Sequence, residues 1–529
     1  MRNTIKCFVF ALLIIANALL AQSEKADWIE GFPDACTTIT LGKKATTDGS
    51  VITSHTDDSH RTRSWVNIVP AKDHSKDETV VMYRREKDDL QAMPAYKHIK
   101  IGEIPQVSHT YQYINTAYPS MNEKQLGIGE STFGGREELQ SDNGLIDAQR
   151  LCQLMLERCT TAREAIALAD QLTQNYGWND SGECLTIADK NEVWHFEIVG
   201  PGKGKKGAVW VAQRVPDDHV SVNANASRIR KIDIRDKEYF MASQNVFQVA
   251  KENGWWNPEE GEFEFCYAYA PHGRSSVAAS RREWRVFDLL APSLKLNPEA
   301  ENFPFSVKPD TLVSMEKLIS VFQDYYEGTP YDMTQNLRVK DKEGKSVVSP
   351  LANPFMPYDA NRLHRINGGW GWLGERTIAR WYTMYATIIQ LRSNMPDDIG
   401  GVEWLAMDNV ATSIYIPVYA GTTDLPEAYK TPGRTKGYTL KSAWWAFNRL
   451  GTLTAQRWGE ARYDVQNVWK PMQKEIFDEQ RKMESVLVKS MSMNPRKILT
   501  GQSLKWGKKV VRKAIELGDS FWTKYDEKF

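Results

Sequence analysis

The residues Asp34-Ala35-Cys36-Thr37-Thr38-Ile39-Thr40-Leu41 have the pattern of a β-strand, with alternation after Cys36 and residue types that are enriched in strands. A polar turn containing Asp48-Gly49 follows, and the chain alternates again through Val51-Ile52-Thr53-Ser54-His55. Two such runs around a turn predict a β-hairpin. Cys36 then lies at the tip of the first strand.

An export signal precedes this hairpin. Arg2 and Lys6 come before an apolar run over residues 7–20, and small residues suited to signal peptidase, Ala18 and Ala21, lie at its end. The run is shorter than the roughly 20 residues of a membrane span. We therefore predict a signal peptide at 1–21, a propeptide at 22–35, and an exported protein, periplasmic or extracellular, without a stable membrane anchor.

Removal of the leader before Cys36 places a thiol and a free α-amine on one residue. The reference pKa of an α-amine is about 7.7–8.0, so near neutral pH this group can act as a base. A nucleophile and its base on one residue is the arrangement of N-terminal-nucleophile hydrolases. With the leader attached, the same nitrogen is an amide without basicity, and the precursor is predicted to be an inactive zymogen.

Composition excludes several other functions. The 67 Lys and Arg balance 67 Asp and Glu, so no net charge favours nucleic acid. The nine histidines show no His-Glu-x-x-His spacing, and the cysteines show no Cys-x-x-Cys spacing, so we predict no metal and no cofactor. The glycine-rich turn at 127–135 lacks the context of a phosphate loop.

The remaining cysteines do not resemble a disulfide scaffold. Cys152 and Cys159 lie seven residues apart in a helical pattern, which separates their Cα atoms by about 10.5 Å, beyond the roughly 7 Å limit for a bridge. Pairing of either with Cys184 or Cys266 stays open, because export permits disulfides. Small buried thiols are the favoured interpretation.

The rest of the chain mixes strands and helices, which predicts an α+β layered fold. Strands are expected at 126–128, 185–188, 193–198, 208–212, 219–222, 402–407 and 412–418. Helices are expected at 149–156, 162–174, 283–290, 311–326 and through most of 440–529. We predict one catalytic domain over 36–440 and a helical extension packed on it over 441–529.

Several separated segments together resemble the C69 dipeptidase family, cysteine peptidases related to secernins and, more distantly, to penicillin V acylases and bile-salt hydrolases. In family order they are residues 35–39 (ACTTI), 53–58 (TSHTDD), 117–136, 180–183 (DSGE), 193–197 (VWHFE), 224–229 (ANASRI) and 399–404 (IGGVEW). The resemblance implies a four-layer αββα sandwich of the N-terminal-nucleophile type and hydrolysis of dipeptides through a thioester.

The resemblance also implies roles for single residues. Cys36 becomes the nucleophile, and Asp58 the aspartate that orients its α-amine. Asn225 becomes the side-chain donor to the oxyanion, with Asn223 close enough to be confused with it. Arg281 resembles the downstream active-site arginine of the acylases.

Two positions depart from the acylase branch, and both are expected to contact substrate. The acylases place an arginine where this chain has His55, and the asparagine of bile-salt hydrolases is replaced near Thr132. Two alternatives to a dipeptidase stay open. One is an amidase for N-acyl substrates, and the other is a non-catalytic secreted protein that binds peptides or glycans. A homo-oligomer is also open.

Overall fold

The computed structural model describes residues 35–88, 95–354, 375–489 and 494–526. In these residues two large antiparallel sheets form the centre of the molecule. The first sheet runs, in spatial order, through β16 (Ser306–Val307), β14 (Val220–Asn223), β1 (Ala35–Leu41), β2 (Val51–Asp58), β19 (Thr383–Leu391), β20 (Val402–Met407) and β21 (Ile416–Tyr419). The second runs through β15 (Phe240–Ala242), β13 (Val209–Arg214), β12 (Val193–Val199), β11 (Gly182–Ala188), β10 (Gly127–Gly134), β9 (Met121–Asn122), β8 (Tyr113–Asn115) and β3 (Asn67–Val69).

Three two-stranded ribbons and a set of helices complete the described residues. The ribbons pair β4 (Lys72–Asp73) with β7 (His109–Thr110), β5 (Thr79–Asp88) with β6 (Ala95–Pro105), and β17 (Arg338–Lys340) with β18 (Ser346–Val348). The α-helices are α2 (Ala148–Arg158), α3 (Ala162–Tyr176), α4 (Val246–Glu252), α5 (Phe265–Tyr269), α6 (Val277–Leu290), α7 (Met315–Phe322), α9 (Asp397–Gly400), α10 (Glu427–Lys430), α11 (Ala443–Gln456), α12 (Trp458–Lys489) and α13 (Pro495–Tyr525). Short 3-10 turns are η1 (Glu137–Leu139), η2 (Pro271–Ser275), η3 (Pro292–Leu294), η5 (Val410–Thr412) and η6 (Arg434–Lys436).

The predicted hairpin around Cys36 is confirmed. Strands β1 and β2 pair antiparallel, with Cys36 opposite Asp57 and Ala35 opposite Asp58. From Cys36 onward every residue of both strands is buried, because the hairpin lies inside the sheet and its faces are covered. The nucleophile candidate therefore has a rigid support.

The two large sheets pack closely against each other where β2 faces β10. A Cβ added to Gly129 of β10 would lie 2.1 Å from the backbone oxygen of Ser54 on β2, so only glycine fits there. Thr53 of β2 also bonds Thr186 of β11 through their hydroxyls, 2.7 Å apart. This close approach brings Glu130, the next residue of β10, to the β1–β2 hairpin.

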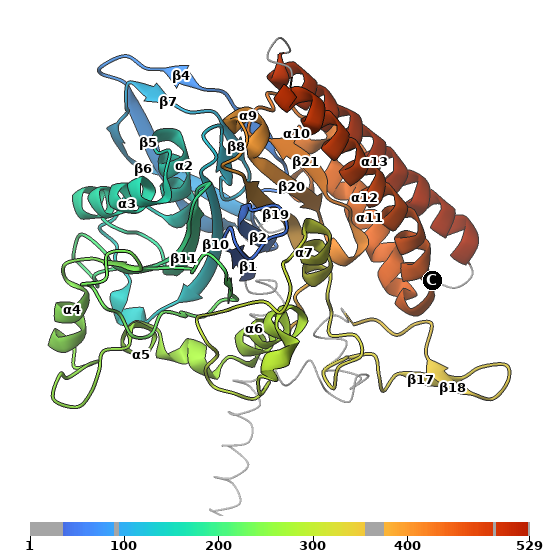
Figure 1. The fold of residues 1–529 in the computed structure, drawn as a ribbon, viewed down its shortest axis with the longest axis horizontal. Helices are drawn as coiled ribbons and strands as arrows, with labels where there is room; N and C mark the ends of the chain where they lie inside the picture. Colours follow the sequence, from blue (N-terminus) through green and yellow to red (C-terminus); the bar gives the residue numbers. More distant parts are fainter. Residues whose placement is uncertain (1–34, 89–94, 355–374, 490–493, 527–529) are drawn as a thin grey trace, which may run out of the picture.

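Helices cover the outer faces of both sheets. Helices α2 and α3 pack on β10, β11 and β12, whereas α11 and α13 pack on β20 and β21. Figure 1 shows these two helical groups on opposite sides of the molecule, with the strands between them. Helix α3 starts at a capping box, in which Thr161 and Glu164 each bond the other's backbone N–H. The α+β class predicted from the sequence is confirmed as a mixed fold with antiparallel sheets.

Most predicted elements match observed ones, but several observed elements were not expected, among them strands β5 and β6 and helix α4. Strand β19 was not expected, although it lies in the middle of the first sheet between β2 and β20. The C-terminal region beyond Ala443 is helical, as predicted. All five described cysteines are buried and free, and Cys159 lies at the C-cap of α2.

The predicted signal peptide lies outside the described residues, as does the propeptide except for Ala35. In the described ranges, every helix is too short or too polar to cross a bilayer.

Candidate active site

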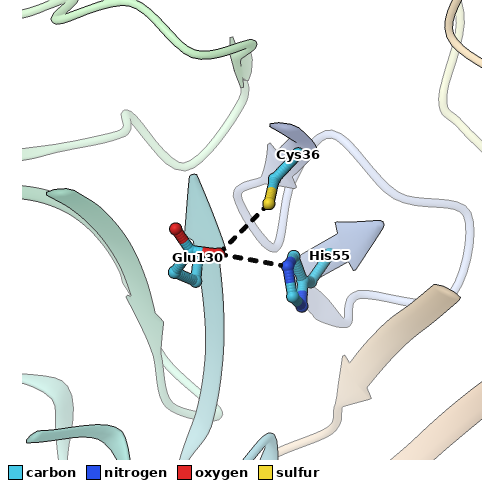
Figure 2. Close-up of side chains that lie close together, drawn as sticks. All are labelled: Cys36, His55 and Glu130. Carbon is cyan, nitrogen blue, oxygen red and sulfur yellow. Dashed lines mark hydrogen bonds and ion pairs between the residues drawn. The ribbon is translucent and has the colours of Figure 1, made fainter. Parts of the chain in front are cut away.

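The thiol of Cys36 lies between the two sheets. Cys36 is only 4% exposed, and its Sγ donates to Glu130 Oε2 at 3.2 Å. Glu130 comes from β10 of the second sheet and is fully buried. Figure 2 shows the side chains of Cys36 and His55 converging on this one carboxylate.

His55 reaches the same carboxylate from β2. Its Nε2 lies 3.3 Å from Glu130 Oε2, and its Nδ1 lies 3.3 Å from the hydroxyl of Tyr385 on β19. The rings of Tyr118 and Tyr385 stand edge-on to the imidazole, with centroids 5.4 and 5.5 Å away. These contacts fix the orientation of His55, which is 2% exposed.

A second carboxyl group, Glu183 of β11, adjoins Glu130. Thr132 Oγ1 lies 3.0 Å from an oxygen of each. Burial and the negative charge of Glu130 raise the pKa of Glu183 well above its usual value, which favours its neutral form. Burial opposes ionisation of Glu130 too, but hydrogen bonds from His55 and Glu183 outweigh it and lower the pKa of Glu130 to about 2. The opposite directions of these two shifts favour a single negative charge in the pair, on Glu130.

Burial and this negative charge both favour the neutral thiol of Cys36. Burial raises the pKa of Cys36 well above its usual value, and the charges of Glu130, Asp57 and Asp58 raise it further. The structure describes Cys36 with Ala35 still attached, so its nitrogen is a peptide amide. In this form the sulfur is a poor nucleophile at neutral pH, because only a thiolate attacks efficiently.

The backbone of Cys36 is held by Asn225 and Arg282. The Cys36 N–H donates to Asn225 Oδ1 at 3.0 Å, and Arg282 donates to the Cys36 carbonyl at 2.7 Å and to Asn225 Oδ1 at 2.9 Å. Asn225 has φ of 64°, a left-handed conformation that asparagine tolerates better than most residues. Burial and the nearby charge of Arg376 lower the pKa of Arg282 to about 9.

Asp58 lies directly across the hairpin from Ala35. Its carboxylate accepts from Thr383 Oγ1 at 2.5 Å and forms a buried ion pair with Arg376. Burial works against the charge on Arg376, but the charge of Asp58 outweighs it and raises the pKa of Arg376. Asp58 is thus a carboxylate held in place by Thr383 and balanced by the charge of Arg376. It lies across the hairpin from Ala35, the residue before Cys36.

The cluster in Figure 2 also has the donor set of a metal site. Donor atoms of Cys36, His55 and Glu130 lie within 4.8 Å of one another. Thiolate, imidazole and carboxylate are all ligands of Zn²⁺. The sequence-based expectation of no metal stays a prediction.

Comparison with known sequences identifies the family. The sequence profile described as "Peptidase family C69" matches residues 35–471. This chain belongs to peptidase family C69. The peptidase is 27% identical over 446 residues to a "Probable dipeptidase" of Latilactobacillus sakei, covering 80% of this chain and 82% of that protein.

Two further relatives have similar coverage. A "Probable dipeptidase" of Salmonella dublin is 25% identical over 419 residues, 76% of the peptidase and 84% of the relative. "Dipeptidase A" of Lactobacillus helveticus is 24% identical over 442 residues, 81% of the peptidase and 83% of the relative. The family match over residues 35–471 includes every site residue described above.

The structure brings most of the predicted site residues of the peptidase together. Cys36, His55 and Thr132 surround Glu130, and Asn225 bonds Cys36, whereas Asn223 pairs with Thr38 in the sheet. Arg281 is placed differently from the expectation. Its guanidinium bonds Glu375 at 3.0 Å and Glu299 at 2.9 Å, and stacks on Tyr331.

Arg282 occupies the position beside Cys36 that was expected for Arg281. The two arginines are neighbours on α6, where successive side chains point about 100° apart, so only one can face β1. Both are buried, and burial patterns in the sequence do not distinguish them. Glu130, Arg376 and Tyr385 were also missing from the predicted set. The only signal for Glu130 was its position beside the glycine-rich turn.

Proposed function

We propose that this peptidase is an exported cysteine dipeptidase that hydrolyses dipeptides through a thioester on Cys36, after removal of the leader frees its α-amine. The relatives described above are named dipeptidases, and their similarity to this chain extends over most of their length. The observation that carries the proposal is the environment of the Cys36 nitrogen. It lies at a strand tip, is bonded to Asn225 at 3.0 Å, and has the fixed carboxylate of Asp58 across the hairpin.

The chemistry needs only groups of this chain and water. The Cys36 thiol passes its proton to the α-amine, and the thiolate attacks the peptide carbonyl to form a C–S bond. The α-ammonium returns the proton to the leaving amine as the C–N bond breaks. Water then attacks the thioester, the α-amine takes its proton, and the thiol is restored as the carboxylic acid leaves.

Asn225 and Arg282 are our candidates for stabilising the oxyanion and the cysteine backbone. An amide carries two N–H donors, and Asn225 uses one toward the Thr132 carbonyl at 2.7 Å. The second is the proposed donor to the oxyanion. Arg282 places a buried positive charge on the Cys36 carbonyl, which favours negative charge nearby.

Leader removal also changes the electrostatics of the thiol. A free α-ammonium beside Sγ offsets the charges of Glu130, Asp57 and Asp58, which raise the thiol pKa in the unprocessed chain. The family match begins at residue 35, just before Cys36, so the leader lies almost entirely outside the family region. We propose that this processing is what activates the zymogen.

The packing of the described elements supports the proposed four-layer αββα fold. Helices α2 and α3, the second sheet, the first sheet, and helices α11 and α13 follow one another through the molecule. The buried thiol lies between the two sheets, where N-terminal nucleophiles are expected in this fold. Export to the periplasm or beyond stays part of the proposal and rests on residues 1–21.

A substrate panel tests the activity. The purified protein is expected to release free amino acids from unmodified dipeptides and to leave penicillin V and conjugated bile acids intact. Cleavage of the latter two without dipeptide hydrolysis would favour the amidase alternative. Binding without turnover, unchanged in Cys36→Ala, would favour the non-catalytic alternative. Activity should rise with pH as the α-amine loses its proton, and chelators should leave it unchanged.

A further inference from the structure

A polar cavity lies beside Tyr118, on the side away from Cys36. It has a volume of about 240 Å³ and is formed by the loop after β2, the β5–β6 ribbon, the segment before β9, and helix α2. Tyr118 connects it to the active site. The Tyr118 hydroxyl accepts from Arg85 at 2.7 Å, and its ring stands edge-on to His55.

Arginines dominate the lining of this cavity. Arg61, Arg63, Arg85 and Arg150 all line it, together with His98, and no acidic residue lies among the described lining residues. We call it the arginine pocket. Four guanidiniums around so small a volume repel one another unless an anion lies between them.

The protein neutralises these charges only in part. Arg85 bonds the carboxylate of Asp180 at 2.7 Å. Arg63 instead donates to the Trp65 carbonyl at 3.0 Å and the Asn67 side chain at 2.6 Å, which are neutral acceptors.

Arg150 is also incompletely partnered. Its Nη1 donates to Gln153 Oε1 at 2.7 Å, again a neutral acceptor. Its Nε is buried and has no hydrogen-bond partner in the part of the chain that the structure describes. A buried donor left in this state is costly, which favours a ligand that accepts from it.

The arginine charges also affect the pKa of His98. Burial lowers the pKa of His98, and the charges of Arg150, Arg85 and Arg63 lower it further, to about 4. Burial likewise lowers the pKa of Arg63 to about 10. Burial is the larger cause of both shifts, and the arginine charges add to the lowering at His98.

We propose that the arginine pocket binds a small oxyanion, either a carboxylate of a peptide or inorganic phosphate. Planar guanidinium groups bind both kinds of oxyanion through paired N–H donors. Tyr118 lies between Arg85 of the pocket and His55 of the active site. The charge of an anion bound in the pocket therefore acts on the active site through Arg85 and Tyr118. Binding does not depend on the proposed hydrolysis.

Calorimetry tests the proposal with inorganic phosphate titrated into the mature enzyme and into full-length Cys36→Ala, which cannot turn over a substrate. We expect one phosphate per chain in at least one of the two forms. Arg63→Gln with Arg150→Gln should weaken its binding at least tenfold. Arg512→Gln is the matched control, because its side chain is 75% exposed on α13. It should leave the affinity unchanged.

Peptide probes distinguish the two sources of the oxyanion. Glycylglycine that competes with phosphate in Cys36→Ala, while glycylglycinamide does not, identifies the peptide carboxylate as the ligand. Phosphate binding without such competition identifies the free anion. Phosphate should also raise the pKa of His98 in an NMR titration, a readout that a folding defect would not mimic. No phosphate binding in either form, or binding that the double substitution leaves unchanged, overturns the proposal.

Discussion

The nucleophile cluster of Cys36, His55 and Glu130 is fully buried, whereas the arginine pocket is only partly buried and its His98 is exposed. Around Cys36, burial and the carboxylates of Glu130, Asp57 and Asp58 raise the pKa of the thiol, while the positive charges of Arg282 and Arg376 also lie close by. Around His98, burial and the charges of arginines lower the pKa of the imidazole. Tyr118 separates the two, because it touches His55 with its ring and Arg85 with its hydroxyl.

The difference shows that each site lacks a counter-charge of the opposite sign. A negative site at Cys36 suits the positive α-ammonium that leader removal creates, and a positive pocket suits an anionic ligand. Neither cluster is well explained as a stabilising element, because buried like charges cost free energy. Such perturbed groups are typical of functional sites.

Loss of the nucleophile should have the largest effect. Cys36→Ala is expected to lower kcat/KM for dipeptides about 10⁴-fold or more, since no other group can form the thioester. The buried Cys152 of α2 provides the control, and Cys152→Ala should stay within a fewfold of the unsubstituted enzyme. Comparable losses in both variants would place the chemistry elsewhere.

Substitution of each of the two neighbouring arginines of α6 distinguishes an active-site residue from one that stabilises the fold. Arg282→Gln removes donors to the Cys36 carbonyl and to Asn225, and should lower kcat about 100-fold in protein shown to be folded by circular dichroism. Arg281→Gln removes the ion pair with Glu375 and should lower the melting temperature while kcat stays within about fivefold. The reverse ranking in kcat would restore the sequence-based choice of Arg281.

Two neighbouring carboxyl groups test the negative charge at the thiol. Glu130→Gln removes an anion that raises the pKa of Cys36, so alkylation by iodoacetamide at pH 7.5 should become about tenfold faster, equivalent to one pKa unit. The pKa of Glu183 is raised well above its usual value, which favours its neutral form, so Glu183→Gln should change this rate much less. The rates are compared between proteins with the same amino terminus, and equal effects would argue against a charge on Glu130 alone.

The smallest effect is expected in the arginine pocket. Burial and the charges of Arg150, Arg85 and Arg63 lower the pKa of His98 to about 4, so Arg150→Gln, which removes one of these charges, should raise it. A histidine NMR titration measures the change, with the exposed Arg512→Gln as control. An unchanged His98 pKa would mean that burial alone depresses it.

The hairpin and the positions of several other strands could be predicted because their sequences alternate or carry β-branched residues. Strand β19, with the sequence TMYATIIQL, escaped prediction because polar and apolar residues do not alternate along it. The family segments located Cys36, Asp58 and Asn225. Glu130 and Arg376 meet the site only through folding, since they lie 94 and 318 residues from their partners Cys36 and Asp58.

The most direct measurement is the amino-terminal sequence and intact mass of the active enzyme. Active fractions should begin at Cys36, and fractions that retain Ala35 should be inert until cleaved. Full dipeptidase activity in protein that still carries the leader would contradict an α-amine base on the nucleophilic residue.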